Sequence, residues 1–278
     1  MTIKEQLSQI ANMLLLNGTL TECPGLVHGK IGQAIFFFYY AHYTGNMLFA
    51  DYAIDLIGEM QNQIHINSPA DYERGIAGIG VGIDYLIRQK FLLVEEDICE
   101  DFDPRMYRAV MYDPWQGFGL YDGLIGHGRY WISRLRYQEP IISAQECLGH
   151  ILNLLEENFE SISYDEQTDV YGFLFDLKQI PGYENCSRLL EKCRNWEHKK
   201  AFSRLKDSVV SQQTYKIQSD YYFKEEKSIE ANLDPDKNLD LDMEKPPAAM
   251  GLFDGYAGEG LLRMDVLGKT DGSWALLL

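Results

Sequence analysis

Apolar residues along the chain follow two helical patterns. In FADYAIDLIGEMQNQI (49–64) they recur at steps of three and four residues, which predicts an amphipathic helix. Its apolar positions are Phe49, Tyr52, Leu56, Met60 and Ile64. In AIFFFYYA (34–41) every position is apolar, so this helix is expected to be buried on all sides. Strand-like alternation is weak and proline is sparse, and the pattern therefore predicts an all-α fold.

A glycine motif recurs along this helical pattern. It reads x-Gly-x-x-Gly-x-Gly/Ala and is followed by mostly apolar residues, as in GLYDGLIGHGRYWISRL (119–135). Full copies have their first glycine at Gly29, Gly75, Gly123 and Gly255, and a degenerate copy keeps only Tyr171-Gly172. These glycines lie 46, 48, 49 and 83 residues apart in chain order. A period of about 47 residues is typical of arrays with one helical hairpin per repeat.

Glycines at a helix start let neighbouring helices approach closely. The loss of helix stability, about 1 kcal/mol per glycine, is offset by packing. We therefore expect each motif to begin an inner helix of a closed α/α toroid. If the inner helices begin at one end of this ring, the residues before the first glycines converge there, among helix N-termini with partial positive charge. The predicted ring consists of His28, Arg74, Asp122, Tyr171 and Asp254.

The segment 206–247 interrupts the repeat. It includes KEEKSIEANLDPDKNLDLDMEKPP, which is rich in charge and poor in periodicity. This composition predicts a charged surface insertion in a single domain that spans residues 1–278. Its alternating acidic residues are spaced like a calcium loop, but Leu239 and Lys245 stand where that loop needs glycine and glutamate, which favours a solvated loop.

Composition and charge restrict the class of partner. The chain is 46% hydrophobic and 24% charged, as in soluble globular proteins. A net charge of -17 disfavours nucleic acid and anionic membranes. The five cysteines are scattered, and the N-terminus lacks the continuous apolar region of a signal peptide. We therefore expect a cytoplasmic protein with free thiols and with no nucleic-acid or membrane partner.

The glycine motifs resemble those of the lanthionine synthetase C (LanC) family, which includes the LanC-like proteins. The matching strings are GLVHGKIG (25–32), GIAGIGVG (75–82), GLYDGLIGHG (119–128) and GLFDGYAGEG (251–260). The resemblance implies an α/α toroid of inner and outer helices. It also implies a zinc ion that activates peptide cysteine thiols, which add to dehydroalanine or dehydrobutyrine and close thioether rings.

The zinc ligands implied by the resemblance are missing. Active members carry Trp-Cys-Tyr-Gly and Cys-His-Gly strings at these helix starts. The first would fall on residues 169–172, where Val170 replaces the cysteine, and Cys-His-Gly does not occur. A catalytic zinc site needs three protein ligands, so no metal or other cofactor is predicted. Elsewhere in the chain, two groups of residues have spacings that could suit a metal ion: Cys147 with His150, and Cys186 with Cys193 and His198. We interpret their cysteines as structural thiols.

Three residues of the ring are candidate catalytic groups. His28 matches the family's His-Gly-x-x-Gly string, whose histidine is implicated as an acid or base, although a packing role suits it equally. Asp122 and Asp254 are expected first to cap their helices. Alternatively, the two carboxylates share a proton and one serves as a general acid.

Four further residues are candidate substrate-binding groups. Arg74 suits an ion pair with the aspartates or binding of an anion. Tyr171 suits the core better than a site. His127 and Glu259 each follow the second glycine of their motif, and so face either the rim of the bore or a neighbouring helix.

These observations predict a LanC-like protein that is linked to peptide modification and lacks the family's zinc. It would bind a peptide or a partner protein in the toroid bore, as a divergent enzyme or as a non-catalytic pseudoenzyme. The alternative from another class is a carbohydrate-active α/α-toroid enzyme that uses paired carboxylates.

Overall fold

The computed structural model describes residues 1–65, 67–93, 97–136, 141–194, 196, 209–222 and 250–278. Within these residues the regular structure consists of eleven α-helices and short 3-10 turns, without a strand. The all-α prediction is confirmed for this part of the chain. No helix in it is long and apolar enough to cross a membrane.

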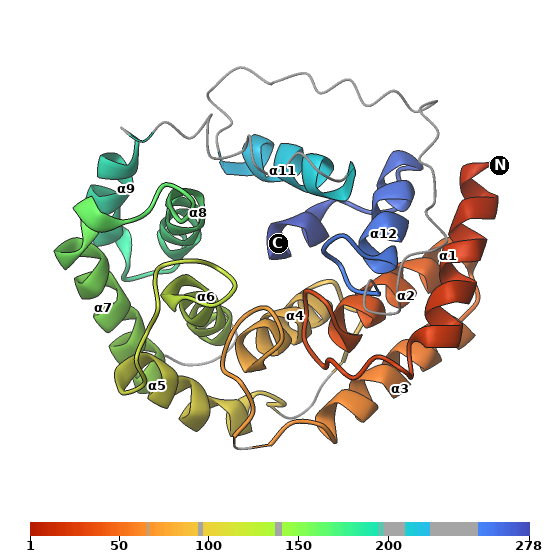
Figure 1. The fold of residues 1–278 in the computed structure, drawn as a ribbon, viewed down its shortest axis with the longest axis horizontal. Coiled ribbons are helices and arrows are strands. Elements are labelled where there is room, and N and C mark those ends of the chain that lie inside the picture. Colours follow the sequence, from red (N-terminus) through yellow and green to blue (C-terminus); the bar gives the residue numbers. More distant parts are fainter. Residues whose placement is uncertain (66, 94–96, 137–140, 195, 197–208, 223–249) are drawn as a thin grey trace. The chain divides into compact units, whose positions relative to one another are not determined.

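The chain forms two compact units. The first combines residues 1–64 with residues 204–278, and the second contains residues 65–203 (Figure 1). Helices of the first unit are α1 (Ile3–Asn17), α2 (Lys30–Thr44), α3 (Leu48–Gln61), α11 (Val209–Tyr222), α12 (Tyr256–Val266) and the 3-10 turn η5 (Ser273–Leu277). Those of the second are α4 (Ile76–Arg88), η1 (Glu100–Phe102), α5 (Asp103–Met111), α6 (Leu124–Leu135), α7 (Ile142–Glu157), η2 (Phe159–Ser161), α8 (Gln167–Leu177), η3 (Glu184–Cys186) and α9 (Ser187–Cys193).

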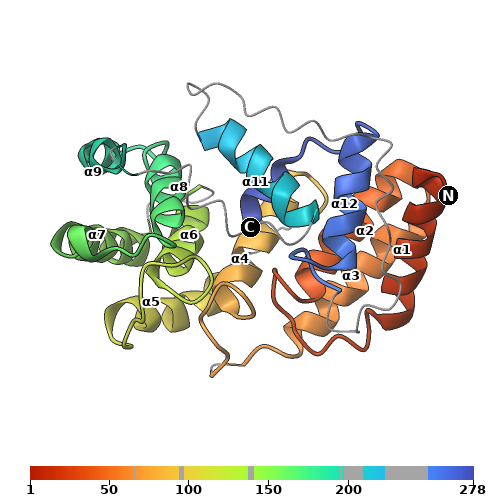
Figure 2. The same cartoon turned by 45° about the horizontal axis from the view of Figure 1, so that its top comes forward.

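The second unit is built from helical hairpins in two layers. Helices α4, α6 and α8 lie side by side in one layer, and α5, α7 and α9 lie behind them in the other (Figures 1 and 2). In the first unit, α2 packs against α1, α3 and α12. Each unit therefore buries its motif helices behind helices that keep a solvent-facing side.

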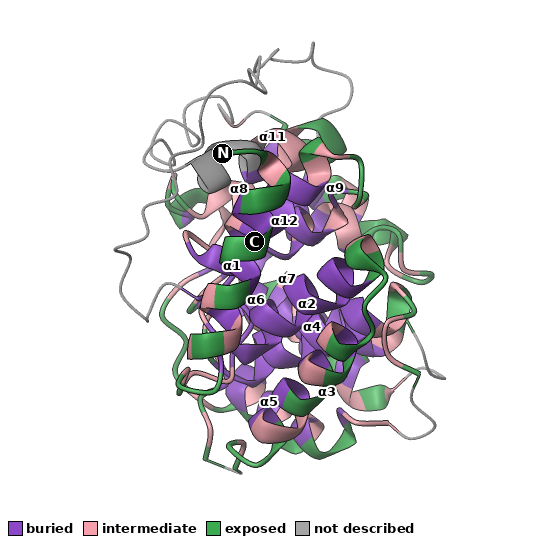
Figure 3. Ribbon diagram, turned by 90° about the vertical axis from the view of Figure 1, so that its right-hand side faces the viewer, coloured by how far each residue is buried: buried purple, intermediate pink, exposed green. Residues whose placement is uncertain are grey.

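Burial follows the hydrophobic pattern (Figure 3). Residues 30–41 of α2 are all buried, as the continuous apolar run predicted. Helix α3 buries one face, which includes Leu56 and Met60, while Phe49 is half-buried and Ile64 lies beyond the helix end. The predicted amphipathic helix is therefore confirmed with a shorter extent.

The glycine motifs mark helix starts at four places. Gly29, Gly75, Gly123 and Gly255 are the N-cap residues of α2, α4, α6 and α12. The degenerate copy is a wrong prediction, because α8 begins at Gln167 and Tyr171-Gly172 lie in its second turn. Within the segment 206–247, predicted as a charged surface insertion, residues 209–222 form helix α11; its other residues lie outside the described residues.

Candidate functional site

The loops before the motif helices are hydrogen-bonded to one another within each unit. In the second unit, the backbone N–H groups of Tyr72 and Glu73 both donate to the carbonyl of Tyr121, at 2.9 and 3.2 Å. In the first unit, the N–H groups of Leu252 and Phe253 both donate to the carbonyl of Val27, at 2.8 and 3.1 Å. All of these residues lie two or three positions before an N-cap glycine. The loop before α12 is therefore joined to the loop before α2 just as the loop before α4 is joined to that before α6.

The later glycines of each motif make room for the neighbouring repeat. A Cβ on Gly126 would overlap the carbonyl oxygen of Leu120 and the Cβ of Tyr72. A Cβ two residues further on, at Gly128, would lie 2.5 Å from the ring of Phe173 on α8. The predicted role of these glycines in close helix approach is confirmed.

The link between the α6 loop and α8 uses side chains instead of a carbonyl. Asp169 on α8 accepts a hydrogen bond from the Leu120 N–H at 2.8 Å, and Glu166 accepts one from the Phe118 N–H. The other carboxylate oxygen of Glu166 accepts from the backbone and hydroxyl of Ser163. Two carboxylates therefore hold the loop that presents Tyr121 and Asp122.

Asp169 is the most unusual titratable group in this cluster. Burial raises its pKa from 3.8 to about 6. The Leu120 N–H and the charge of Arg129 lower this pKa, whereas the charges of Glu166 and Asp122 raise it. Sequence reasoning missed Asp169 as a site residue, because its surroundings come from loops about 50 positions away in the sequence.

Three predicted site residues of the second unit occupy different environments. Arg74 is exposed, and its Nε lies 3.6 Å from Glu73 Oε1, so its ion pair is with Glu73 and not with Asp122. Asp122 is exposed and accepts no hydrogen bond from the described residues, so the expected capping of α6 is wrong for this residue. Tyr171 is only 8% exposed inside α8, which removes it from the predicted ring of helix-start residues.

His127 is half-buried in the first turns of α6. Burial lowers its pKa from 6.5 to about 4, so the imidazole is neutral at pH 7. The charges of Asp71, Arg105 and Asp113 act on it, and Arg105 and Asp113 are paired at 2.9 Å. The charges of Arg105 on α5 and of Asp113, two residues after the end of α5, therefore reach the His127 imidazole.

In the first unit, His28 and Asp254 lie on the two loops that are hydrogen-bonded to each other. The half-buried ring of His28 meets the Phe253 ring edge-on, with 6.4 Å between the centroids. Asp254 adopts a left-handed backbone with φ of 51°, a conformation that aspartate tolerates better than most residues. Glu259 pairs with the fully buried Arg263 at 3.5 Å, and Arg263 also donates to Gln6 of α1. Glu259 therefore forms an ion pair within its own helix, α12.

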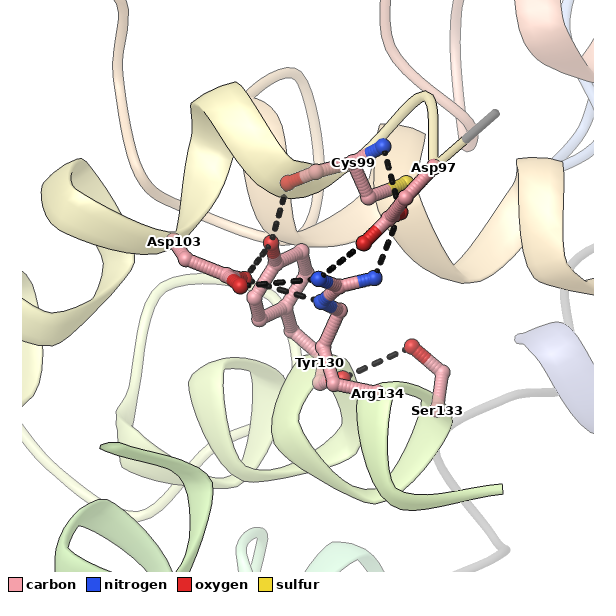
Figure 4. A network of polar contacts seen from close by, with 6 residues as sticks. All are labelled: Asp97, Cys99, Asp103, Tyr130, Ser133 and Arg134. Carbon is pink, nitrogen blue, oxygen red and sulfur yellow. Dashed lines mark hydrogen bonds and ion pairs between the residues drawn. The ribbon is translucent and has the colours of Figure 1, made fainter. Parts of the chain in front are cut away.

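A second polar cluster in the second unit joins η1 and α5 to α6 (Figure 4). The Arg134 guanidinium donates to both carboxylate oxygens of Asp97 and of Asp103, over 2.6–2.9 Å. The Tyr130 hydroxyl donates to Asp103 and lies 3.2 Å from the Cys99 carbonyl. Because every guanidinium nitrogen of Arg134 is used inside the protein, this cluster is a structural clamp.

The donor set does not fit the zinc site that the resemblance implies. Val170, in the position of a ligand cysteine, is fully buried in α8. Burial raises the thiol pKa of Cys147 and of Cys193 to about 12, which disfavours the thiolate that zinc requires. No three His, Cys, Asp or Glu side chains within the described ranges are placed to hold a metal ion, and His198 lies outside these ranges.

Comparison of the chain with models of known families, with curated proteins and with solved structures finds no match. A relation to the LanC family therefore stays a prediction from the motifs. The contacts of the motif loops are the observations from which a function is proposed.

Proposed function

We propose that the chain is a LanC-like closed α/α toroid whose motif loops bind a peptide at one end of the ring. Equivalent links between repeats support closure. The α4 loop joins the α6 loop, and the α6 loop joins α8, in chain order. The α12 loop joins the α2 loop by the same pair of N–H donors, although these loops are about 225 residues apart. A link from the last motif back to the first is what a ring of repeats requires.

The side chains directly before the N-cap glycines support peptide binding. They pair an aromatic ring with a carboxylate in two loops, as Tyr121–Asp122 and Phe253–Asp254, and they add His28 and Arg74 in the others. Aromatic faces and charged hydrogen-bonding groups suit a peptide backbone with mixed side chains. The ends of the motif loops are therefore the proposed binding surface.

The proposed function stops at binding, without the family's cyclisation step. Zinc would supply thiol activation there, and the donor set described above does not fit it. An unassisted cysteine thiol, with a pKa of about 8.5, is mostly protonated at pH 7 and adds slowly. We place this peptide-binding protein in the cytoplasm, with a peptide or a partner protein as its ligand and no role for nucleic acid or membranes.

A defined probe tests this proposal. It is a fluorescein-labelled linear peptide with one cysteine and one dehydroalanine, and its binding is followed by fluorescence anisotropy. Wild-type protein is expected to bind the probe without consuming its thiol, and Asp122→Ala is expected to weaken binding about five-fold or more. Asp101→Ala, at an exposed position of η1, is the matched control. Lack of probe binding, or stoichiometric zinc with thiol loss, would contradict the proposal.

One observation favours the alternative of a carbohydrate-active enzyme. Asp169 keeps its proton to a higher pH than ordinary aspartate, and it lies within the electrostatic reach of the carboxylate of Asp122. A protonated and an ionised carboxyl are the pair that glycoside hydrolysis uses. Hydrolysis of aryl glycosides by wild-type protein, lost in both Asp169→Asn and Asp122→Asn, would establish this function in place of the first.

A further inference from the structure

The fourth repeat begins at Glu166, six residues before the glycine that the sequence pattern selected. Glu166 is the N-cap of α8, and its carbonyl accepts the first helical hydrogen bond from the Val170 N–H at 3.0 Å. The carbonyl of Gly75 accepts the equivalent bond from Ile79 at 3.2 Å. Glu166 therefore holds the same hydrogen-bonding position as the first motif glycine, with a helical backbone (φ -89°) where the N-cap glycines are extended.

Contacts between repeats give the same register. Asp169, three residues after the N-cap, bonds to Leu120, which lies three residues before the N-cap of α6. The preceding pair of repeats shows the same contact. Gly126, three residues after the N-cap of α6, lies against Tyr72, three residues before the N-cap of α4. Seven residues after three of the N-caps, those of α8, α6 and α2, an aromatic ring covers a glycine of the neighbouring helix, as Phe173 on Gly128, Tyr130 on Gly80 and Phe36 on Gly260.

In this register Tyr164 and Asp165 directly precede the N-cap of the fourth repeat. Tyr121 and Asp122 form the same dipeptide at the same position of the third repeat. In both repeats the aspartate is exposed and the tyrosine is half-buried. Helix α8 lies beside α6 (Figure 2), so the two dipeptides belong to neighbouring loops.

We infer that Tyr164 and Asp165, and not Tyr171, are the residues with which the fourth repeat contacts the peptide. The inference rests on the proposed function, which assigns binding to the residues directly before each motif helix. It extends the binding surface by a second Tyr-Asp pair.

Thiol labelling tests the register without a ligand. In a Cys23→Ser background, which removes the half-buried thiol, Asp165→Cys and Asp122→Cys are treated with a fluorescent maleimide. Both are expected to label at similar rates, and about ten-fold or more faster than the buried native thiols of the same protein. Labelling of Asp165→Cys as slowly as those thiols would overturn the register.

Anisotropy with the cysteine–dehydroalanine probe tests the ligand contact. Asp165→Ala and Tyr164→Ala are each expected to weaken binding about five-fold or more, as Asp122→Ala does. Tyr171→Phe and the control Asp101→Ala are expected to bind as wild type does. Normal binding by Asp165→Ala and Tyr164→Ala, while Asp122→Ala is impaired, would overturn the inference and leave the proposed function intact. If wild-type protein fails to bind the probe, the proposed function fails and the ligand role fails with it, whereas labelling still decides the register.

Discussion

Replacing Asp169 by asparagine isolates the effect of its partly buried charge on stability. Asparagine has nearly the same shape. Its side-chain oxygen can still accept the hydrogen bond from the N–H of Leu120, a residue that is only 2% exposed. The charge is lost, and with it the penalty of keeping an ionised carboxylate away from water. We therefore expect Asp169→Asn to increase the free energy of unfolding at pH 7.

The pKa of Asp169 gives the magnitude and the pH range. The pKa is about 6 in the folded protein and 3.8 in the reference state, so folding favours the protonated form. This stabilisation is fully present below pH 3.8 and is lost as the pH rises through 6. The difference between the two values corresponds to about 3 kcal/mol, an upper limit for the gain in Asp169→Asn. Between pH 5 and pH 7 the advantage of the variant should grow by about 1.3 kcal/mol and then stay constant.

Urea unfolding at pH 5, 6, 7 and 8, followed by far-UV circular dichroism, measures this advantage. Hydrogen exchange of residues 119–135 gives a local readout for the second unit. Asp101→Asn, at an exposed position, controls for the change of one charge and should stay within about 0.5 kcal/mol of wild type at every pH. An advantage of Asp169→Asn that does not grow between pH 5 and pH 7 would refute the reasoning. It would mean that Arg129 and the Leu120 N–H fully stabilise the carboxylate.

Two further predictions concern packing and the buried clamp. Gly126→Ala should destabilise the protein by about 2 kcal/mol or more, because its Cβ would overlap the backbone carbonyl of Leu120, in the loop before α6, and the Cβ of Tyr72 in the neighbouring repeat. Gly149→Ala, in the middle of α7 with open space around its Cβ, should instead stabilise by about 0.5–1 kcal/mol; thermal melts that give both variants the same sign would contradict this. Arg134→Met should destabilise by about 3–5 kcal/mol because two carboxylates lose their cationic partner, whereas Arg194→Met, at an exposed ion pair, should change the urea midpoint little.

Most helix positions could be predicted from the sequence because the signals are local. A periodic apolar face and an N-cap glycine act within a few residues, and α2, α4, α6 and α12 follow them. The start of α8 could not be found from glycine spacing. Gly172, the glycine that continues the spacing, lies inside the helix and not at its start. The signal that could have found it is the Tyr-Asp dipeptide that precedes both Gly123 and Glu166.

The candidate site was harder to predict because its properties depend on distant contacts. Arg74 and Asp122 are exposed, as expected of residues that directly precede the N-cap of a helix. The ion pair of Glu259 with Arg263, and the pKa values of His127 and Asp169, depend on which other elements surround each side chain. No spacing within one motif contains that information.

The fourth repeat changes the chemistry of the motif loops as well as their register. The links between α4 and α6 and between α12 and α2 are backbone hydrogen bonds, whose donors and acceptors do not titrate. The link between α6 and α8 depends on Glu166 and Asp169, and a protonated carboxyl accepts a hydrogen bond less well than a carboxylate. Because the pKa of Asp169 is about 6, the strength of this link changes between pH 5 and pH 7, whereas the backbone links stay constant over that pH range. Any pH dependence of the proposed peptide binding between pH 5 and pH 7 should therefore be reduced in Asp169→Asn, which has no proton to exchange at this position.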